Sequence, residues 1–352
     1  MREFDFLIVD FMVEESHKVY CNAIIEEINN KCTSVVIEKD GYIEIKEDDS
    51  HKLFQISTKE IVGNYPIKAR LNTIYNFLKA YNIAKKYRYR KVLVLGYDPT
   101  MFLFMVKELM SMGDIYVVEH HQLDEVCDSD WKRKIWNLYK DKVHHILLDE
   151  SIVKMVSEEF SLDIDKIHVY PHPCVFKENY KKEEQSSKIE VLCISQSNDV
   201  YQIQELIDYE KESHFFKKNN IQIVIRNNSN WDASGLDGFK TIDGYLSSDE
   251  YNQLNKECDI VLMPFPLQYR YRCSGTLIDA LAAGKKVISS SVPESVVYSE
   301  LYPELCRTYS SIHEIGNLIL KLNDGNNEKI RGNFFEHQKE MKKIGISDIC
   351  NL

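Results

Sequence analysis

One continuous stretch, residues 258–293, constrains the fold more than any other part of this chain. It reads CDIVLMPFPLQYRYRCSGTLIDALAAGKKVISSSVP. Residues 260–263 are wholly apolar and are followed by a proline, which is typical of a buried parallel strand. Residues 274–276 open a predicted helix that ends at Gly284, and residues 286–289 begin a second strand. The stretch therefore predicts a βαβ unit.

The loop between the first strand and the helix carries guanidinium and hydroxyl groups. Ligands of open α/β sheets bind beyond the carboxyl ends of strands, where helix N-termini direct free N–H groups. The groups at this end belong to Arg270, Arg272, Ser274 and Thr276. Because arginines, hydroxyls and a helix start converge, the loop predicts an anion site. The alternative is a surface loop in which the arginines stack on the neighbouring tyrosines, Tyr269 and Tyr271.

The order and spacing of this stretch resemble the carboxyl-terminal domain of GT-B glycosyltransferases that use nucleotide-sugar donors, of the family 4-like kind. The matching residues are Cys258-Asp259-Ile260-Val261 and the run DALAAGKKVI from Asp279 to Ile288. Many retaining members place two glutamates eight residues apart across the loop, where this chain has Tyr271 and Asp279. The resemblance implies an α/β protein of GT-B type, with two Rossmann-like β/α/β domains facing a cleft. Retaining and inverting transfer both stay open.

The resemblance also implies a layout for the donor site. The two arginines and the helix start would hold the diphosphate, Asp279 would accept hydrogen bonds from the ribose hydroxyls, and the backbone around Gly244 and Tyr245 would flank the base. An exposed helix acid is the alternative for Asp279. The residues expected to bind donor are Gly244, Tyr245, Arg270, Arg272, Ser274, Gly275, Thr276 and Asp279.

Two βα alternations on either side of a polar segment predict two domains. Residues 1–172 form the expected acceptor domain, 173–188 the linker and 189–327 the donor domain. We expect residues 328–352 to form a helical tail that returns toward the first domain, as in many GT-B chains. The length of 352 residues is sufficient for two such cores.

Composition limits the partners. The formal net charge of −11 argues against nucleic-acid binding. The nine cysteines lack CxxC spacing, so reduced intracellular thiols explain them better than disulfides or zinc. No window approaches a membrane span and the amino terminus carries no cleavage signal, so we expect a cytoplasmic protein.

The first domain offers several candidate general bases. His120 and His121 follow a strand predicted at residues 115–118, and Glu14 lies in the loop after the first strand. GT-B enzymes often carry a histidine facing the donor sugar after a similar strand, whereas the alternative is two ordinary polar loop residues. Asp10 and Glu15 lie at the same kind of position, and the spacing does not choose among these groups.

Metal-independent transfer is the further expectation. Asp163-Ile164-Asp165 has the spelling of a metal-binding carboxylate pair, but it precedes a strand at residue 167 and so predicts a solvated turn. Arginines and a helix N-terminus can neutralise leaving-group charge instead. We therefore expect no cofactor, with a UDP or GDP sugar as substrate.

A second local feature is basic. Residues 61–97 contain no acidic residue, and residues 68–91 accumulate lysine and arginine. Leu71, Ile74, Leu78 and Tyr81 recur at helical spacing, which predicts an amphipathic helix packed on the sheet with a solvated basic face. The alternative is that the basic face contacts anionic lipid or an anionic acceptor, with peripheral attachment at the inner membrane face.

Three shorter patterns make local predictions. Asp98 is the expected N-cap of a helix that runs to about Met112, with Pro99 at its first position. Residues 42–45 are a strand candidate, and residues 201–216 are expected to form one helix.

Together these features predict a glycosyltransferase of the hexosyltransferase type, active in polysaccharide biosynthesis. It would move a sugar from a nucleotide-diphosphate sugar to a hydroxyl of a glycan, a lipid-linked or a protein-linked acceptor. Two alternatives stay open: a nucleotide-sugar epimerase on the same two-domain plan, and a catalytically silent subunit that binds a partner.

Overall fold

The computed structural model describes residues 2–10, 18–39, 41, 43–56, 65–173, 188–227, 231–244, 246–323, 334, 336, 340 and 344–352. Of the expected functional residues, Glu14 and Tyr245 lie outside these ranges. So do residues 174–187 of the expected linker and most of the expected tail helix.

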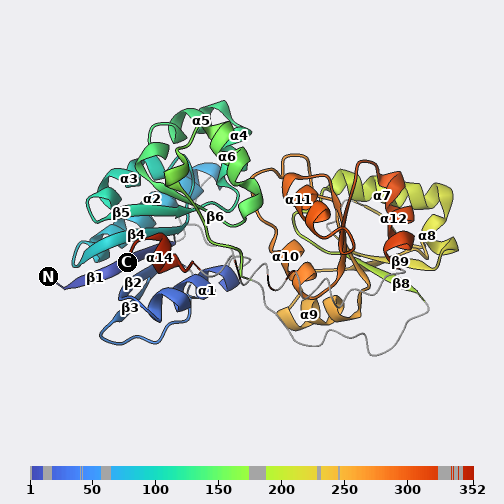
Figure 1. Ribbon diagram of the computed structural model, residues 1–352, viewed down its shortest axis with the longest axis horizontal. Helices are drawn as coiled ribbons and strands as arrows, with labels where there is room; N and C mark the ends of the chain where they lie inside the picture. The colour runs from blue at the N-terminus through green and yellow to red at the C-terminus, as the bar shows by residue number, and fades with distance from the viewer. Residues whose placement is uncertain are drawn as a thin grey trace. The chain divides into compact units, whose positions relative to one another are not determined.

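The chain forms two compact units (Figure 1). The first comprises Met1–Pro173, Tyr271–Cys273 and Met341–Leu352, and the second comprises Cys174–Arg270 and Ser274–Glu340. Each unit contains one sheet whose strands are all parallel, and helices join most of the consecutive strands, so both are α/β units of Rossmann-like type.

The sheet of the first unit has the strand order β3-β2-β1-β4-β5-β6-β7. Its strands are β1 Glu3–Asp10, β2 Ser34–Glu38, β3 His51–Gln55, β4 Arg88–Gly96, β5 Asp114–Val118, β6 His144–Leu147 and β7 Ile167–Val169. Its helices are α1 Lys18–Asn29, α2 Tyr65–Ala84, α3 Phe102–Met110, α4 Gln122–Cys127, α5 Asp130–Trp136 and α6 Val153–Phe160. The strand order reverses between β1 and β4, so the topological switch point lies between their carboxyl ends.

Alternation along β1 divides the core of this unit into two faces. Leu7 and Val9 belong to one apolar cluster, whereas Phe6 and Ile8 belong to another. The second cluster also holds residues of α1 and of the short α14, Ile346–Ile349. The backbone N–H of Ile346 donates to Glu27 Oε1 at 2.8 Å, so the described end of the chain is anchored on α1.

The sheet of the second unit has the order β10-β9-β8-β11-β12-β13. Its strands are β8 Ile189–Cys193, β9 Ile221–Arg226, β10 Phe239–Ile242, β11 Ile260–Met263, β12 Lys286–Ser290 and β13 Cys306–Tyr309. Its helices are α7 Val200–Ser213, α8 Phe215–Lys218, α9 Ser248–Glu257, α10 Gly275–Ala282, α11 Pro293–Leu301 and α12 Ile312–Asn323. Here the switch point lies between β8 and β11.

The stretch 258–293 contains β11, α10 and β12, which confirms the predicted βαβ unit. All four residues of β11 are buried. Ser274 is the N-cap of α10, and Gly284 follows the helix with φ 70°, a left-handed conformation that glycine adopts without strain.

Three local predictions were wrong. Helix α3 begins at Phe102 and not at Pro99, although Asp98 makes the side-chain contacts of a cap: its Oδ1 accepts from the N–H groups of Thr100 and Met101 in the turn ahead of the helix. Residues 43–45 form no strand. The helix expected at residues 201–216 divides into α7 and α8, because His214 adopts a left-handed conformation with φ 52°.

The buried face of α2 is not the one that its large apolar residues predicted. Phe77, Ala80 and Ala84 pack into the core, as does the side chain of Asn76 at 2% exposure. The larger residues Leu71, Ile74 and Leu78 point outward, with exposed fractions of 46%, 37% and 52%.

None of the helices in the described part of the chain has the length and apolar character that crossing a membrane would require. The cysteines in the same ranges are free thiols.

Candidate functional site

The candidate donor site of the second unit lies at its switch point, where α10 begins. The loop after β8 and the loop after β11 meet here, since the N–H of Asp199 donates to the carbonyl of Pro264 at 2.6 Å. Open parallel sheets bind ligands at this position.

Two contacts fix the start of α10. Ser274 Oγ accepts from the N–H of Leu277 at 3.2 Å, as an N-cap does. The N–H of Ser274 itself donates to both carboxylate oxygens of Glu294, at 3.1 and 3.0 Å, and Glu294 is 1% exposed in the first turn of α11. The first-turn N–H groups of Gly275 and Thr276 are therefore the ones that an incoming anion would meet.

Asp279 and Thr276 lie one turn apart on α10, and both face Tyr251 of α9. Burial raises the pKa of Tyr251 to about 12, the charge of Asp279 adds to this rise, and a hydrogen bond with Thr276 opposes it. Asp279 is half-buried, so it is neither the fully exposed helix acid of the alternative interpretation nor a core residue.

Gly244 follows the edge strand β10 and has φ 78° with nothing within 4 Å of a hypothetical Cβ. Its carbonyl accepts from Arg226 Nε at 3.0 Å, and Asn227 Nδ2 donates to Asp243 Oδ1 at 2.8 Å, so the loops after β9 and β10 are joined. Three inter-strand spacings separate β10 from β11, about 14 Å. A ligand that contacts both Gly244 and α10 has to span this distance.

The structure assigns the two expected phosphate-binding arginines to different units. Arg270 belongs to the second unit, whereas Arg272 belongs to the first. There the Arg272 guanidinium forms an ion pair with Asp124 of α4, whose side chain is 1% exposed. Asp124 Oδ1 also accepts from the N–H of Tyr271 at 2.8 Å. Asp124 therefore orients the backbone and the guanidinium of this loop together.

The two tyrosines of the loop pack against phenylalanines. Tyr269 stacks on Phe265 at 4.3 Å between ring centroids, and Tyr271 meets Phe160 edge-on at 5.2 Å.

His120 lies at the carboxyl end of β5 in the first unit, and Gln122 fixes its loop. Gln122 Oε1 accepts from the N–H groups of His120 and His121 at 2.7 and 3.0 Å. His120 Nε2 lies 3.1 Å from the carbonyl oxygen of Leu95. Because a carbonyl only accepts, Nε2 carries the proton and Nδ1 is the basic nitrogen of the neutral ring.

His121 has a different environment. Its Nε2 lies 3.2 Å from Glu125 Oε1, and Lys132 Nζ lies 2.6 Å from the other carboxylate oxygen. Burial would raise the pKa of Glu125, but the hydrogen bonds from His121 and Lys132 outweigh it and lower the pKa to about 2. His121 thus belongs to an ion-pair cluster on α4 and α5.

A buried polar network that the sequence did not reveal lies directly beside His120. Glu119 accepts from Tyr97 Oη at 2.8 and 3.0 Å and lies 2.7 Å from His145 Nδ1. Both members of the Glu119–His145 pair are fully buried, and His145 Nε2 lies 3.0 Å from the carbonyl of Lys140. Both ring nitrogens of His145 and both carboxylate oxygens of Glu119 therefore have buried partners. The network fixes the end of β5.

The structure confirms the turn expected at residues 163–165. Asp163 Oδ1 accepts from the N–H of Asp165 at 3.1 Å, and the pair precedes β7 at its amino end. These carboxylates lie beside the amino end of β7, whereas His120 follows the carboxyl end of β5, so the two lie at opposite ends of the parallel strands.

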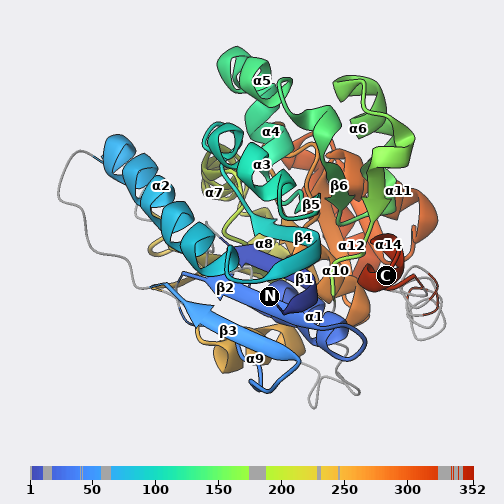
Figure 2. The ribbon, with the colours of Figure 1, turned by 90° about the vertical axis from the view of Figure 1, so that its left-hand side faces the viewer.

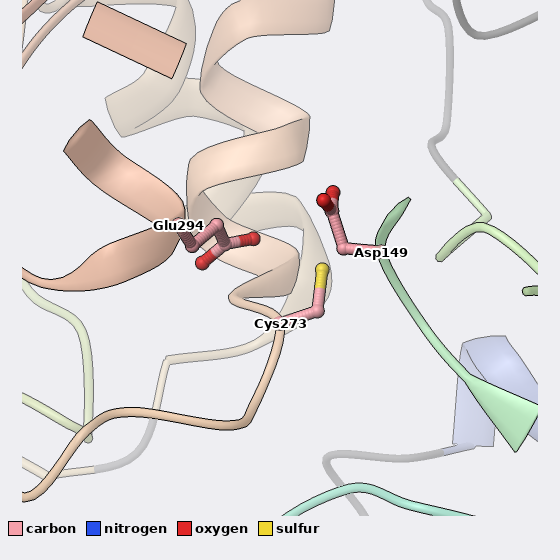
Figure 3. A group of neighbouring side chains, drawn as sticks. All are labelled: Asp149, Cys273 and Glu294. Carbon is pink, nitrogen blue, oxygen red and sulfur yellow. The ribbon is translucent and has the colours of Figure 1, made fainter. Parts of the chain in front are cut away.

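A second group of potential metal ligands comprises Asp149, Cys273 and Glu294, drawn in Figure 3. Asp149 and Cys273 belong to the first unit and Glu294 to the second, and Glu294 is already held by the N–H of Ser274. Asp149 Oδ1 accepts from the N–H of Ser151 at 2.7 Å. Within either unit the set supplies fewer than three ligands, and a structural metal site takes about four.

Sequence reasoning missed Asp124, Glu294 and Asn198. Asn198 lies in the loop after β8, and its Oδ1 is buried with no hydrogen-bond partner in the described ranges. This loop carries neither glycine nor a basic residue, so no motif marked it. The one local sequence signal beside Glu294 is Pro293 at the first position of α11, which marks the start of a helix.

The fold is that of the GT-B glycosyltransferases. The chain resembles sucrose-phosphate synthase from Thermosynechococcus elongatus, with a TM-score of 0.65, 11% identity and coverage of 100% of this chain and 97% of that one. It also resembles Alr3699/HepE from Anabaena in complex with UDP, with a TM-score of 0.63, 11% identity and coverage of 99% and 96%.

A third similar structure is WaaG, a glycosyltransferase involved in lipopolysaccharide biosynthesis, with a TM-score of 0.57, 10% identity and coverage of 98% and 97%. No protein-family model matches the chain, and no curated protein sequence matches it either.

Proposed function

We propose that this protein is a glycosyltransferase that moves a hexose from a nucleotide-diphosphate sugar to a hydroxyl acceptor. The observation that carries the proposal is the start of α10 at the switch point of the second sheet, where a helix N-terminus offers free N–H groups that could bind an anion. The Anabaena relative of the same fold was solved with UDP and with UDP and glucose, which supports a donor of this class. The glycosyltransferase neighbours do not favour an epimerase.

Residues 1–172 would bind the acceptor and residues 189–327 the donor. In the donor site the N–H groups of Gly275 and Thr276, with Ser274, would bind the diphosphate, and Arg270 and Arg272 would neutralise its charge. The position of Asp279, one turn further along α10, supports its assignment to the ribose.

The base would lie beside the loop after β10, in which Gly244 and Tyr245 occur. Gly244 supports this assignment because its position leaves space that a side chain would fill.

We propose His120 as the general base of an inverting transfer. The support is its tautomer, because the neutral ring keeps Nδ1 basic while Nε2 is held by the Leu95 carbonyl. His121 and Glu14 are weaker candidates: His121 is occupied by Glu125, and Glu14 rests on its position in the sequence alone.

The leaving group would be stabilised without a metal, through the arginines and the α10 N-terminus. We further propose a cytoplasmic enzyme of polysaccharide biosynthesis that attaches peripherally to an anionic membrane face through the basic segment 68–91.

Nucleotide release from UDP- and GDP-hexoses, measured with a panel of glycan and lipid-linked acceptors, tests the activity. The proposal expects acceptor-dependent release that His120→Gln strongly reduces and that His121→Gln retains. Interconversion of sugars without acceptor would indicate an epimerase, and absence of both binding and turnover would indicate a silent subunit.

A further inference from the structure

Helix α2 presents an apolar stripe to solvent. Leu71, Ile74 and Leu78 are separated by three and four residues and therefore lie on one face. All three are exposed, whereas Phe77, Ala80 and Ala84 on the other side of the helix are buried. The stripe covers about 10 Å of helix axis. Figure 2 shows the amino-terminal part of α2 extending away from the sheet of the first unit.

Positive charge follows the stripe directly. Lys85, Lys86 and Arg88 are exposed in the turn after α2 and at the start of β4. Residues 61–97 contain no aspartate or glutamate, although the whole chain has a formal net charge of −11. The exposed apolar stripe of α2 is therefore followed in the chain by exposed basic residues that lie outside the helix.

We propose that Leu71, Ile74 and Leu78 insert into the surface of an anionic membrane while Lys85, Lys86 and Arg88 contact lipid phosphates. This names the surface behind the peripheral attachment proposed above, and it does not depend on the transferase activity. An apolar helix face flanked by lysine and arginine is the combination that binds the interface of anionic bilayers.

Charge complementarity favours a membrane over a second copy of the chain. In a symmetric dimer the same patch lies on both sides of the interface. Two copies of this surface would bring basic residues together without an acidic residue from the segment to pair with them. Anionic lipid supplies the missing negative charge.

Neither part of the surface is sufficient alone. Three partly exposed aliphatic side chains bury little area, and a few basic residues give attraction that salt screens over about 10 Å. The proposal therefore predicts binding that needs anionic lipid and the apolar stripe together.

Co-sedimentation of the full chain with phosphatidylcholine vesicles, with and without phosphatidylglycerol, tests this. The parent should bind the phosphatidylglycerol vesicles and lose binding with added salt. Leu71→Gln/Leu78→Gln should weaken binding by about tenfold or more, because two apolar insertions are removed. Lys85→Gln/Lys86→Gln should weaken binding at low salt and reduce the salt dependence.

The matched control is Leu138→Gln/Leu301→Gln, which removes two leucines of similar exposure, 58% and 54%, elsewhere on the surface. It should bind vesicles as the parent does. The proposal is overturned if the parent binds neither vesicle, or if the stripe variant binds like the control. A parent dimer that Leu71→Gln/Leu78→Gln converts to a monomer, seen by light scattering, would show that a second copy covers the stripe instead.

Because vesicle binding and nucleotide release are separate readouts, failure of one leaves the other intact.

Discussion

Two histidines and a lysine, linked by hydrogen bonds near the amino ends of β6 and β7, should make the stability of the first unit depend on pH. His144 Nδ1 lies 2.8 Å from His168 Nε2, and Lys166 Nζ lies 3.2 Å from His144 Nε2. Since an ammonium group only donates, His144 Nε2 accepts and Nδ1–H donates to His168. The ring of His144 also stacks on Tyr116 at 4.5 Å. The arrangement requires a neutral His144.

Burial, the charge of Lys166 and the neighbouring His168 lower the pKa of His144 from its ordinary 6.5 to about 4. Between these values the unfolded chain binds a proton that the folded chain does not, so acid favours unfolding. The contribution is complete above pH 6.5 and is lost as the pH falls to about 4. Lowering the pKa from 6.5 to about 4 corresponds to roughly 3 kcal/mol at most. Because His144 is only half-buried, solvent screening reduces this to about 1–2 kcal/mol.

Urea unfolding of the parent and of His144→Phe, measured between pH 7 and pH 4, checks this magnitude. Phenylalanine keeps the stack on Tyr116 but cannot titrate, so the variant should lose about 1–2 kcal/mol less than the parent over this range. A Trp231→Phe background leaves Trp131 and Trp136 of the first unit as fluorescence reporters.

His313→Gln on the second unit is the control, because its side chain is exposed. It should follow the parent at every pH. Parallel losses of stability in the parent and in His144→Phe would refute the reasoning.

Three further changes have expected outcomes. Asp98→Ala should destabilise the first unit by about 1–2 kcal/mol because it removes the acceptor that closes the turn before α3, and Asp98→Asn should cost less; equal urea midpoints would contradict this. Glu119→Ala leaves His145 buried without its partner and should cost about 3–5 kcal/mol, so a thermal midpoint equal to that of the parent would show that the network is not stabilising. Removal of metal with EDTA should leave donor turnover unchanged, whereas loss that manganese restores would show that a metal takes part.

The features that the sequence predicted well are those with local causes. β11, α10 and β12 follow from an apolar run, a serine N-cap and a terminal glycine, all within residues 258–293. The capping box of α9, formed by Ser247 and Glu250, likewise has a cause within four consecutive residues. Such signals need no knowledge of what the segment packs against.

The features that the sequence missed depend on partners far along the chain. Asp124 accepts a hydrogen bond from the N–H of Tyr271, which lies 147 residues further along the chain, and no sequence spacing predicts such a contact. The face of α2 was misjudged because large apolar residues at helical spacing suggested the buried side, whereas the sheet accepts small alanines and Asn76. Tertiary packing, and not periodicity, decided that orientation.

The central proposal is that the donor diphosphate is bound by the start of α10 together with Arg270 and Arg272. Calorimetric titration of UDP, GDP and uridine into the parent, Arg272→Ala and Asp279→Ala tests it most directly. Arg272→Ala should weaken diphosphate binding by about 1.5–3 kcal/mol and leave uridine binding nearly unchanged, because only the phosphates lose a charge-assisted contact. Asp279→Ala should weaken nucleoside and diphosphate alike. If both variants bind UDP and GDP as the parent does, the donor site lies elsewhere and the account is wrong.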